Sequence, residues 1–210
     1  MRLRHIVALS SMLGLLGLTA PAHAEDGQGF VEREHFTLQK LLHEPASAAR
    51  DAQVNTALDG FVDYDELIRR AFGEPCHPTL PNCEDIWAGY DEAKRAEVHD
   101  LLKALLQKSY RKNLLKTLDW EVAYEGQRDM GSETRVITKA KSKLKPHDPP
   151  TRVDYIVKQT PSGWKVVEWT VEGSSVTKNY YDQFYKKMHK PEEGYANIVA
   201  KLREKVAKKD

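Results

Sequence analysis

The sequence lacks the short motifs that mark common catalytic centres. It contains no G-x-S-x-G nucleophile elbow, no H-E-x-x-H metal motif, no P-loop and no G-x-G-x-x-G dinucleotide fingerprint. The histidines beyond residue 24 are scattered among predicted polar faces and loops: His35, His43, His77, His99, His147 and His189. That scatter favours surface or helix-capping roles over metal binding. We therefore predict no catalytic residue, no metal site and no cofactor.

One pair of carboxylates leaves an enzymatic alternative open. Glu168 and Glu172 lie at alternating positions of a predicted strand and would share one face. If that face pointed into a cavity, the pair would suit acid/base chemistry with raised pKa values, and if it pointed outward both groups would be solvated. The solvated interpretation is favoured for Glu168, while Glu172 is also placed to orient the turn at Gly173.

An excess of basic charge is missing as well. The 32 lysines and arginines are nearly balanced by 31 aspartates and glutamates. Nucleic-acid binding needs a basic excess to neutralise phosphates, so the balance argues against it. Basic residues do outnumber acidic ones within residues 139–210. This local excess fits attraction to anionic headgroups or acidic docking surfaces, but ordinary solvated surface is the favoured interpretation.

Long apolar runs are absent except at the N-terminus. Residues 6–20 are mostly apolar, follow Arg2 and Arg4, and precede the small-residue site Ala22-His23-Ala24. This pattern predicts a secretory signal peptide, residues 1–24, and the run is shorter than the roughly 20 residues that span a bilayer. No cysteine lies directly after this apolar run, which argues against a lipoprotein anchor. Residues 25–210 are expected to form one exported, soluble domain.

Cysteine is scarce. Cys76 and Cys83 are the only two, and Pro78 and Pro81 between them exclude a continuous helix. One close pair in an exported chain predicts a disulfide, which would stabilise the fold by roughly 2 to 3 kcal/mol in the chain-entropy model. A zinc or redox site that includes His77 is less favoured, because the spacing is neither C-x-x-C nor that of a zinc finger.

Apolar periodicity divides the exported chain into a helical part, a sheet and a second helical part. The first part, residues 30–118, has the 3.6-residue period and capping residues such as Asp63 and Asp91. Its expected helices are 30–42, 46–58, 64–72 and 91–118.

The period changes to two within residues 119–172, which predicts strands near 120–124, 136–144, 153–157 and 164–171. Their short, turn-rich links favour an antiparallel meander. Helices at 175–188 and 192–207 are expected to close the chain within residues 175–207. The order predicts an α+β fold: a four-stranded antiparallel sheet with the helices on one face.

The most specific pattern lies where the last strand meets the next helix. Trp164-Lys165-Val166 is followed by Val171-Glu172-Gly173-Ser174-Ser175, and then by Asn179-Tyr180 and Gln183-Phe184. A looser match runs from Gly60 to Gly73. These residues resemble the signature of the MlaC-type periplasmic phospholipid-binding proteins, also called the toluene-tolerance family. Tyr181 departs from it, because the family usually has arginine there.

The resemblance implies a fold, a function and partners. The sheet would be curved, with NTF2-like or cystatin-like character, and a helical subdomain would close a cavity. The protein would be a soluble periplasmic carrier of the Mla lipid-transport system, with a phospholipid as cargo. Its partners would be an outer-membrane lipoprotein complex and an inner-membrane complex of an MCE-domain protein and an ABC transporter. The alternatives are a carrier of another envelope lipid such as a hopanoid, a small exported enzyme on an NTF2-like scaffold, and an interaction module with a packed interior.

A soluble carrier must enclose its acyl chains, because exposing about 16 carbons to water costs on the order of 13 kcal/mol. The candidate lining comes from one face of the sheet and from the helices around it. The predicted lipid-binding residues are Leu101, Leu102, Leu105, Val136, Thr138, Ala140, Val153, Tyr155, Val157, Trp169, Val171, Tyr180 and Phe184. Each of them, taken alone, is more often an ordinary core residue than a ligand contact.

Overall fold

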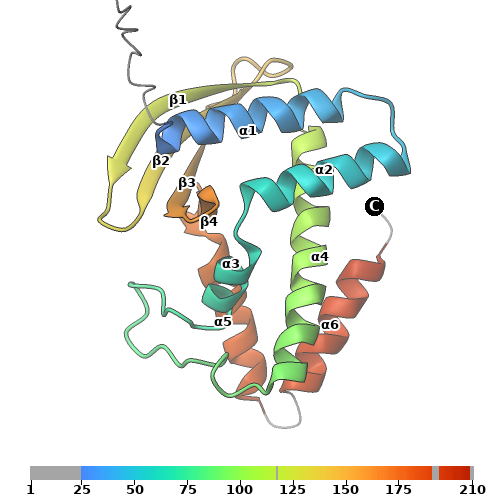
Figure 1. The fold of residues 1–210 in the computed structure, drawn as a ribbon, viewed down its shortest axis with the longest axis vertical. Coiled ribbons are helices and arrows are strands. Elements are labelled where there is room, and N and C mark those ends of the chain that lie inside the picture. The colour runs from blue at the N-terminus through green and yellow to red at the C-terminus, as the bar shows by residue number, and fades with distance from the viewer. Residues whose placement is uncertain (1–24, 117, 191–193, 209–210) are drawn as a thin grey trace, which may run out of the picture.

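A computed structural model describes residues 25–116, 118–190 and 194–208. The predicted signal peptide, residues 1–24, lies outside the described residues. Within them, six helices and one antiparallel sheet make up the fold (Figure 1), which confirms the predicted α+β class. In the same ranges, no helix is both long and apolar enough to cross a membrane.

The first two helices form a hairpin across the sheet (Figure 1): α1 (Gly27–Leu42) and α2 (Ala48–Phe61). Asp26 and Ser47 cap them by accepting hydrogen bonds from the N–H groups of Gly29 and Arg50. The prediction for the second helix, residues 46–58, was shifted. Ser47 sets its start, and Gly60 continues the helix because glycine tolerates helical backbone angles at a modest cost.

Helices α3 (Tyr64–Ala71) and α4 (Glu92–Lys116) begin at the predicted caps. The Asp63 side chain accepts from the N–H of Glu66, and Asp91 accepts from that of Lys94. The N–H of Asp63 also donates to the Val166 carbonyl. The start of α3 is therefore tied directly to the sheet.

The sheet has the strand order β1 (Trp120–Asp129), β2 (Thr134–Ser142), β3 (Thr151–Thr160), β4 (Gly163–Val171) and β5 (Ser174–Ser175). The prediction of four strands missed β5, which has only two residues and leaves no periodic signal. Strand β1 also runs beyond its predicted end. A bulge at Gly126, with φ of 115°, lets the pairing with β2 continue.

The register places alternate residues of the central strands on one face. Tyr155 lies opposite Val136 on β2 and opposite Trp169 on β4, while Val153 lies opposite Thr138 and Val171. Rings from α1 and α4 contact this face. A second register shift, beside Val157, adds to the curvature that bulges impose on a sheet.

The last two helices are α5 (Val176–Met188) and α6 (Tyr195–Ala207). Helix α5 packs against α3, and α6 packs against α4 (Figure 1). The predicted start of the last helix at residue 192 lies outside the described residues. Buried apolar side chains of the sheet and of both helical parts form one continuous core.

Candidate ligand pocket

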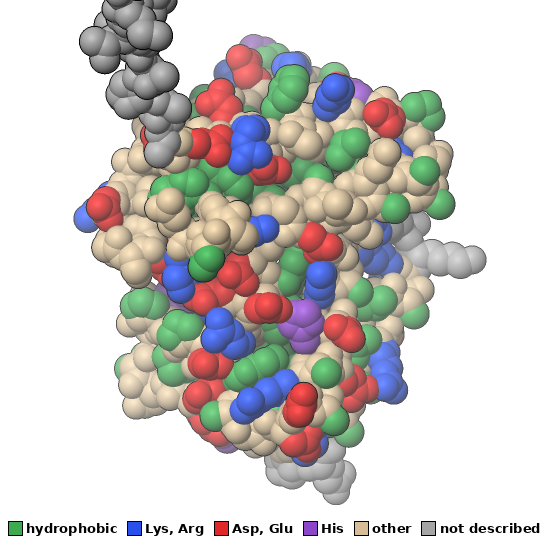
Figure 2. Space-filling view, viewed as in Figure 1, with side chains coloured by type: hydrophobic (Ala, Val, Ile, Leu, Met, Phe, Trp, Pro, Cys, Tyr) green, Lys and Arg blue, Asp and Glu red, His purple; other side chains and the backbone are tan. Residues whose placement is uncertain are grey.

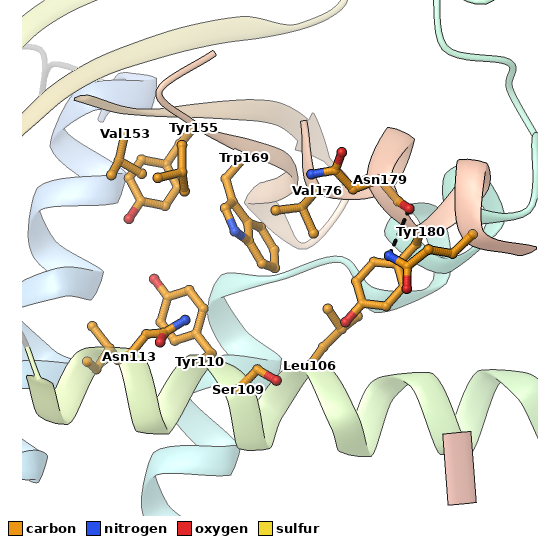
Figure 3. Close-up of a pocket in the computed structure, with 13 residues that line it drawn as sticks. Leu106, Ser109, Tyr110, Asn113, Val153, Tyr155, Trp169, Val176, Asn179 and Tyr180 are labelled. Atoms are coloured by element: carbon orange, nitrogen blue, oxygen red, sulfur yellow. Dashed lines mark hydrogen bonds between the residues drawn. The ribbon is translucent and has the colours of Figure 1, made fainter. Parts of the chain in front are cut away.

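A cavity of about 400 Å³ lies between the curved face of the sheet and helices α4 and α5 (Figure 3). Helix α4 supplies side chains at the spacing of one helical face, and β3, β4 and α5 supply the opposite wall. The lining residues are Leu106, Ser109, Tyr110, Asn113, Leu114, Val153, Tyr155, Trp169, Val171, Val176, Asn179, Tyr180 and Gln183.

The walls are aliphatic and aromatic, and the rim is polar. The Trp169 ring packs edge-on against Tyr110, with 5.8 Å between centroids. At the rim Asn179 and Gln183 are exposed, and the Gln183 side chain donates to the Asn179 carbonyl at 3.0 Å. Val171 is 40% exposed at the same edge. The cavity therefore opens to solvent beside Val171.

Two tyrosine hydroxyls face each other inside the cavity (Figure 3), those of Tyr110 and Tyr155. Burial raises the pKa of Tyr155 to about 12 and also raises that of Tyr110. Both side chains are therefore neutral at physiological pH. The interior offers hydrogen-bonding groups without charge, which suits an uncharged ligand segment.

Some of the residues predicted to bind lipid line this cavity: Val153, Tyr155, Trp169, Val171 and Tyr180. The structure places the others elsewhere: Leu101, Leu102, Leu105, Val136, Thr138, Ala140, Val157 and Phe184. Val136 and Val157 share the sheet face but are fully buried, and Val157 lies beneath Gly27 of α1. Phe184 stacks on Phe72, 4.4 Å away.

Sequence reasoning missed the part of α4 that lines the cavity. Leu106, Tyr110 and Leu114 recur every fourth residue, and Ser109 and Asn113 lie next to them on the same helix. The sequence did hold an indication of this cavity: polar residues interrupt a leucine-rich helix face. A helix face that packs only against the core is usually apolar throughout. The prediction followed instead the leucines that precede them.

Glu168 contradicts the predicted solvated position, because its side chain is buried. Its carboxylate accepts hydrogen bonds from the Ser175 hydroxyl at 2.6 Å, from the Thr177 hydroxyl and from the backbone N–H of Val176 at 3.2 Å. The chain turns back at Gly173 and lays the start of α5 over this carboxylate. The exposed Glu172 instead accepts from the N–H of Arg152. Glu168 thus holds the β4–α5 junction.

His35 contradicts the prediction of surface or capping roles for the histidines. It is buried against the sheet, with Nδ1 2.9 Å from the Tyr124 hydroxyl. Burial lowers the pKa of His35 to about 4, so the ring is neutral at pH 7. Among the described residues, no cluster of histidine, cysteine or carboxylate side chains has the arrangement of a metal site.

The predicted disulfide between Cys76 and Cys83 is confirmed. The loop that it closes is anchored to α5, because the N–H of Glu84 donates to the Tyr181 hydroxyl at 2.8 Å. Tyr181 is only 4% exposed. The aromatic residue at the position of the expected arginine therefore serves an internal contact with the cysteine loop.

The chain is similar to known proteins in its sequence and in its fold. The family model described as MlaC protein matches residues 36–204. A phospholipid-binding protein from Ralstonia solanacearum, solved in complex with a phospholipid, is similar in structure, with a TM-score of 0.70 and 20% sequence identity. The match covers 87% of this chain and 98% of that chain, and at this identity it shows the shared fold. No curated protein matches. Because the family model spans most of the chain, including every strand and the residues that line the cavity, the protein belongs to the MlaC family.

Proposed function

We propose that this protein is a periplasmic phospholipid carrier, which holds acyl chains in the cavity between the sheet and helices α4 and α5. The observation that carries the proposal is the cavity itself: apolar walls, no charged side chain in the lining and a polar rim open to solvent. The Ralstonia protein with the same fold holds a phospholipid. Each methylene moved from water into such a cavity contributes about 0.8 kcal/mol.

The carrier exchanges lipid with membrane complexes and performs no covalent chemistry. The signal-peptide pattern supports export, and family membership supports partners of the Mla system: an outer-membrane lipoprotein complex and an inner-membrane complex of an MCE-domain protein and an ABC transporter. The two register shifts that bend the sheet support its NTF2-like or cystatin-like character. The enzymatic alternative is less favoured, because the Glu168 carboxylate is occupied by hydrogen bonds at the β4–α5 junction.

Native mass spectrometry of the protein purified from its own periplasm tests the proposal. Near-stoichiometric two-chain phospholipid is the expected result, and extraction followed by fragmentation would identify another envelope lipid such as a hopanoid. A lipid-free protein that takes up no lipid from phospholipid vesicles would contradict the carrier function.

A tryptophan at Ser109 tests the position of the acyl chains. Ser109 lines the cavity from α4, so Ser109→Trp is expected to fill it and to reduce lipid occupancy by more than about half, since little ligand volume remains. Ala96→Trp is the matched control, because Ala96 is exposed on the same helix. Thermal unfolding of both variants checks the fold. Equal occupancy in a folded Ser109→Trp protein would place the lipid elsewhere.

A further inference from the structure

The cysteine loop, residues 76–83, covers part of the sheet face that points away from the apolar cavity between the sheet and helices α4 and α5. Arg135, Ile156 and Glu168 lie side by side on this outer face, because the register pairs them across β2, β3 and β4. Two cavities, of about 720 and 450 Å³, lie between this face and the loop. The lining residues that both share are His77, Thr79, Arg135 and Thr170. The two cavities therefore adjoin at Arg135.

The adjoining cavities differ in chemical character. The larger one is lined by polar and charged residues. The smaller one has an apolar part, formed by Pro75, Cys76, Pro78, Met130 and Ile156. Cavities of this size accept small molecules, and their few polar groups fix the orientation of the ligand. An occupant of both cavities is therefore expected to have an apolar body and a polar end.

Arg135, in the wall that the two cavities share, has a donor without an acceptor. Its Nε is buried and has no hydrogen-bond partner among the described residues. A carboxylate oxygen of Asp154 lies 3.9 Å from a terminal guanidinium nitrogen, which is too far for a hydrogen bond. Buried donors in native proteins are nearly always satisfied, by protein, water or ligand. The planar guanidinium presents paired N–H groups that match an oxyanion.

The other charged groups around Arg135 already have partners. Arg152 binds Asp154 through two hydrogen bonds, of 2.8 and 2.9 Å, and Arg70 donates to a carboxylate on its own helix at 2.6 Å. Glu168 accepts from hydroxyl and backbone N–H groups at the β4–α5 junction. Of the three arginines that line these cavities, Arg135 is thus the one without a hydrogen bond to a described residue.

A second arginine adds positive charge beside Arg135. Arg128 on β1 is exposed and lies directly opposite Arg135 in the register. Like charges that face each other across neighbouring strands destabilise a sheet. Within the described ranges, Arg128 forms no ion pair that offsets this repulsion. A bound anion at Arg135 would offset it.

We infer that the adjoining cavities bind a small organic acid. Its carboxylate accepts hydrogen bonds from Arg135, and its apolar body lies against Ile156 and the prolines of the cysteine loop. Free inorganic phosphate shares the oxyanion chemistry but lacks the apolar body, so the two sources can be separated. The inference goes beyond the proposed carrier function and does not depend on it, because Arg135 does not line the apolar cavity.

The test compares phenylacetate, phenylacetamide and inorganic phosphate as ligands of the mature protein isolated with its lipid, so that the apolar cavity is filled. Amide shifts in ¹⁵N-labelled protein measure each affinity and locate each ligand. Phenylacetate is expected to bind at least about tenfold more tightly than phenylacetamide, because the amide loses the charged hydrogen bonds to the guanidinium. The largest shifts are expected at His77, Arg135 and Thr170, which line both cavities.

Variants of Arg135 assign the binding to this residue. Arg135→Gln should abolish the preference for phenylacetate, and Arg135→Lys should weaken it, because lysine keeps the charge but lacks the paired donors. Lys143→Gln is the charge-matched control, since Lys143 is exposed and lies outside both cavities. Thermal unfolding checks each fold. Native mass spectrometry of Arg135→Gln should show the lipid occupancy of the unmodified protein.

Equal affinity for phenylacetate and phenylacetamide in the unmodified protein overturns the recognition of an oxyanion. Phosphate that binds as tightly as phenylacetate shows that the apolar part contributes nothing and overturns the assignment to an organic acid. A folded Arg135→Gln or Arg135→Lys protein that keeps the full preference places the ligand elsewhere. Each of these results leaves the carrier function standing, whereas protein that holds no lipid contradicts that function alone.

Discussion

Single buried polar residues hold the parts of this protein in position. His35 is packed edge-on against Tyr155, with 4.9 Å between ring centroids, and links α1 to the sheet through Tyr124. Tyr181 links α5 to the cysteine loop in the same manner. Each contact joins segments that are far apart in the sequence. Such contacts are costly to break, because a buried donor or acceptor is left without a partner.

The buried His35 predicts a loss of stability in mild acid. Its pKa in the folded protein, about 4, lies below the ordinary value of 6.5, so between these values the unfolded chain binds a proton that the folded protein does not. Stability therefore falls as pH drops through this window, by up to roughly 3 kcal/mol. Urea unfolding at pH 7, 6 and 5 measures the slope.

His35→Gln should flatten this part of the pH profile, because the glutamine does not titrate. His147→Gln, at an exposed loop position, is the control and should keep the slope of the unmodified protein. Parallel profiles for His35→Gln and the unmodified protein would show that His35 does not couple protonation to folding.

At the scale of elements, the junction of β4, β5 and α5 organises the binding region. Gly173 has φ of 77°, a left-handed conformation that glycine adopts without strain. The turn reverses the chain, so that Ser175 caps α5 and Val176 and Tyr180 face the apolar cavity. The family signature therefore marks the element that places α5 against the sheet.

Removal of the charge at Glu168 should loosen this junction. In Glu168→Gln an NH₂ group replaces one carboxylate oxygen, so that a hydrogen-bond donor faces the groups that donate to Glu168. The variant is therefore expected to lose about 2 to 3 kcal/mol in unfolding free energy. Glu172→Gln, at the exposed position in the same turn, should lose less than about 0.5 kcal/mol. Denaturant unfolding measures both. A Glu168→Gln protein as stable as Glu172→Gln would contradict the structural role of the carboxylate.

At the scale of the whole molecule, helices and sheet share one continuous core. On the face seen in Figure 2, acidic and basic side chains are intermixed over the helices, as expected of a solvated surface.

The disulfide is expected to stabilise the fold without shaping the apolar cavity. Cys76→Ser/Cys83→Ser should lower unfolding free energy by roughly 2 to 3 kcal/mol, the loop-closure contribution of a short loop. No residue of this loop lines the apolar cavity. Phospholipid occupancy, measured by native mass spectrometry, should therefore persist in the variant. A loss of occupancy in protein that remains folded would show that the loop supports the lipid site.

Much of this arrangement could be predicted from local chemistry. Asp63, Asp91 and Ser175 cap helices where their hydroxyl or carboxylate groups precede apolar periodic segments. The alternation of the strands determined that Val153, Tyr155, Trp169 and Val171 share a face, because strand side chains alternate with a period of two. The presence of two cysteines in one short segment was enough to predict the disulfide.

Only the tertiary structure decided which apolar surfaces enclose a cavity and which are packed solid. Periodicity identifies the buried side of α4, but this helix both packs against α6 and lines the cavity with Leu106 and Tyr110. Likewise the alternation in β4 does not determine that a two-residue strand and α5 will cover Glu168. Whether a side chain is buried depends on which distant segments of the chain pack over it, and the packing of the elements decides that. A periodic pattern along the chain indicates only which side of a helix or strand faces other elements.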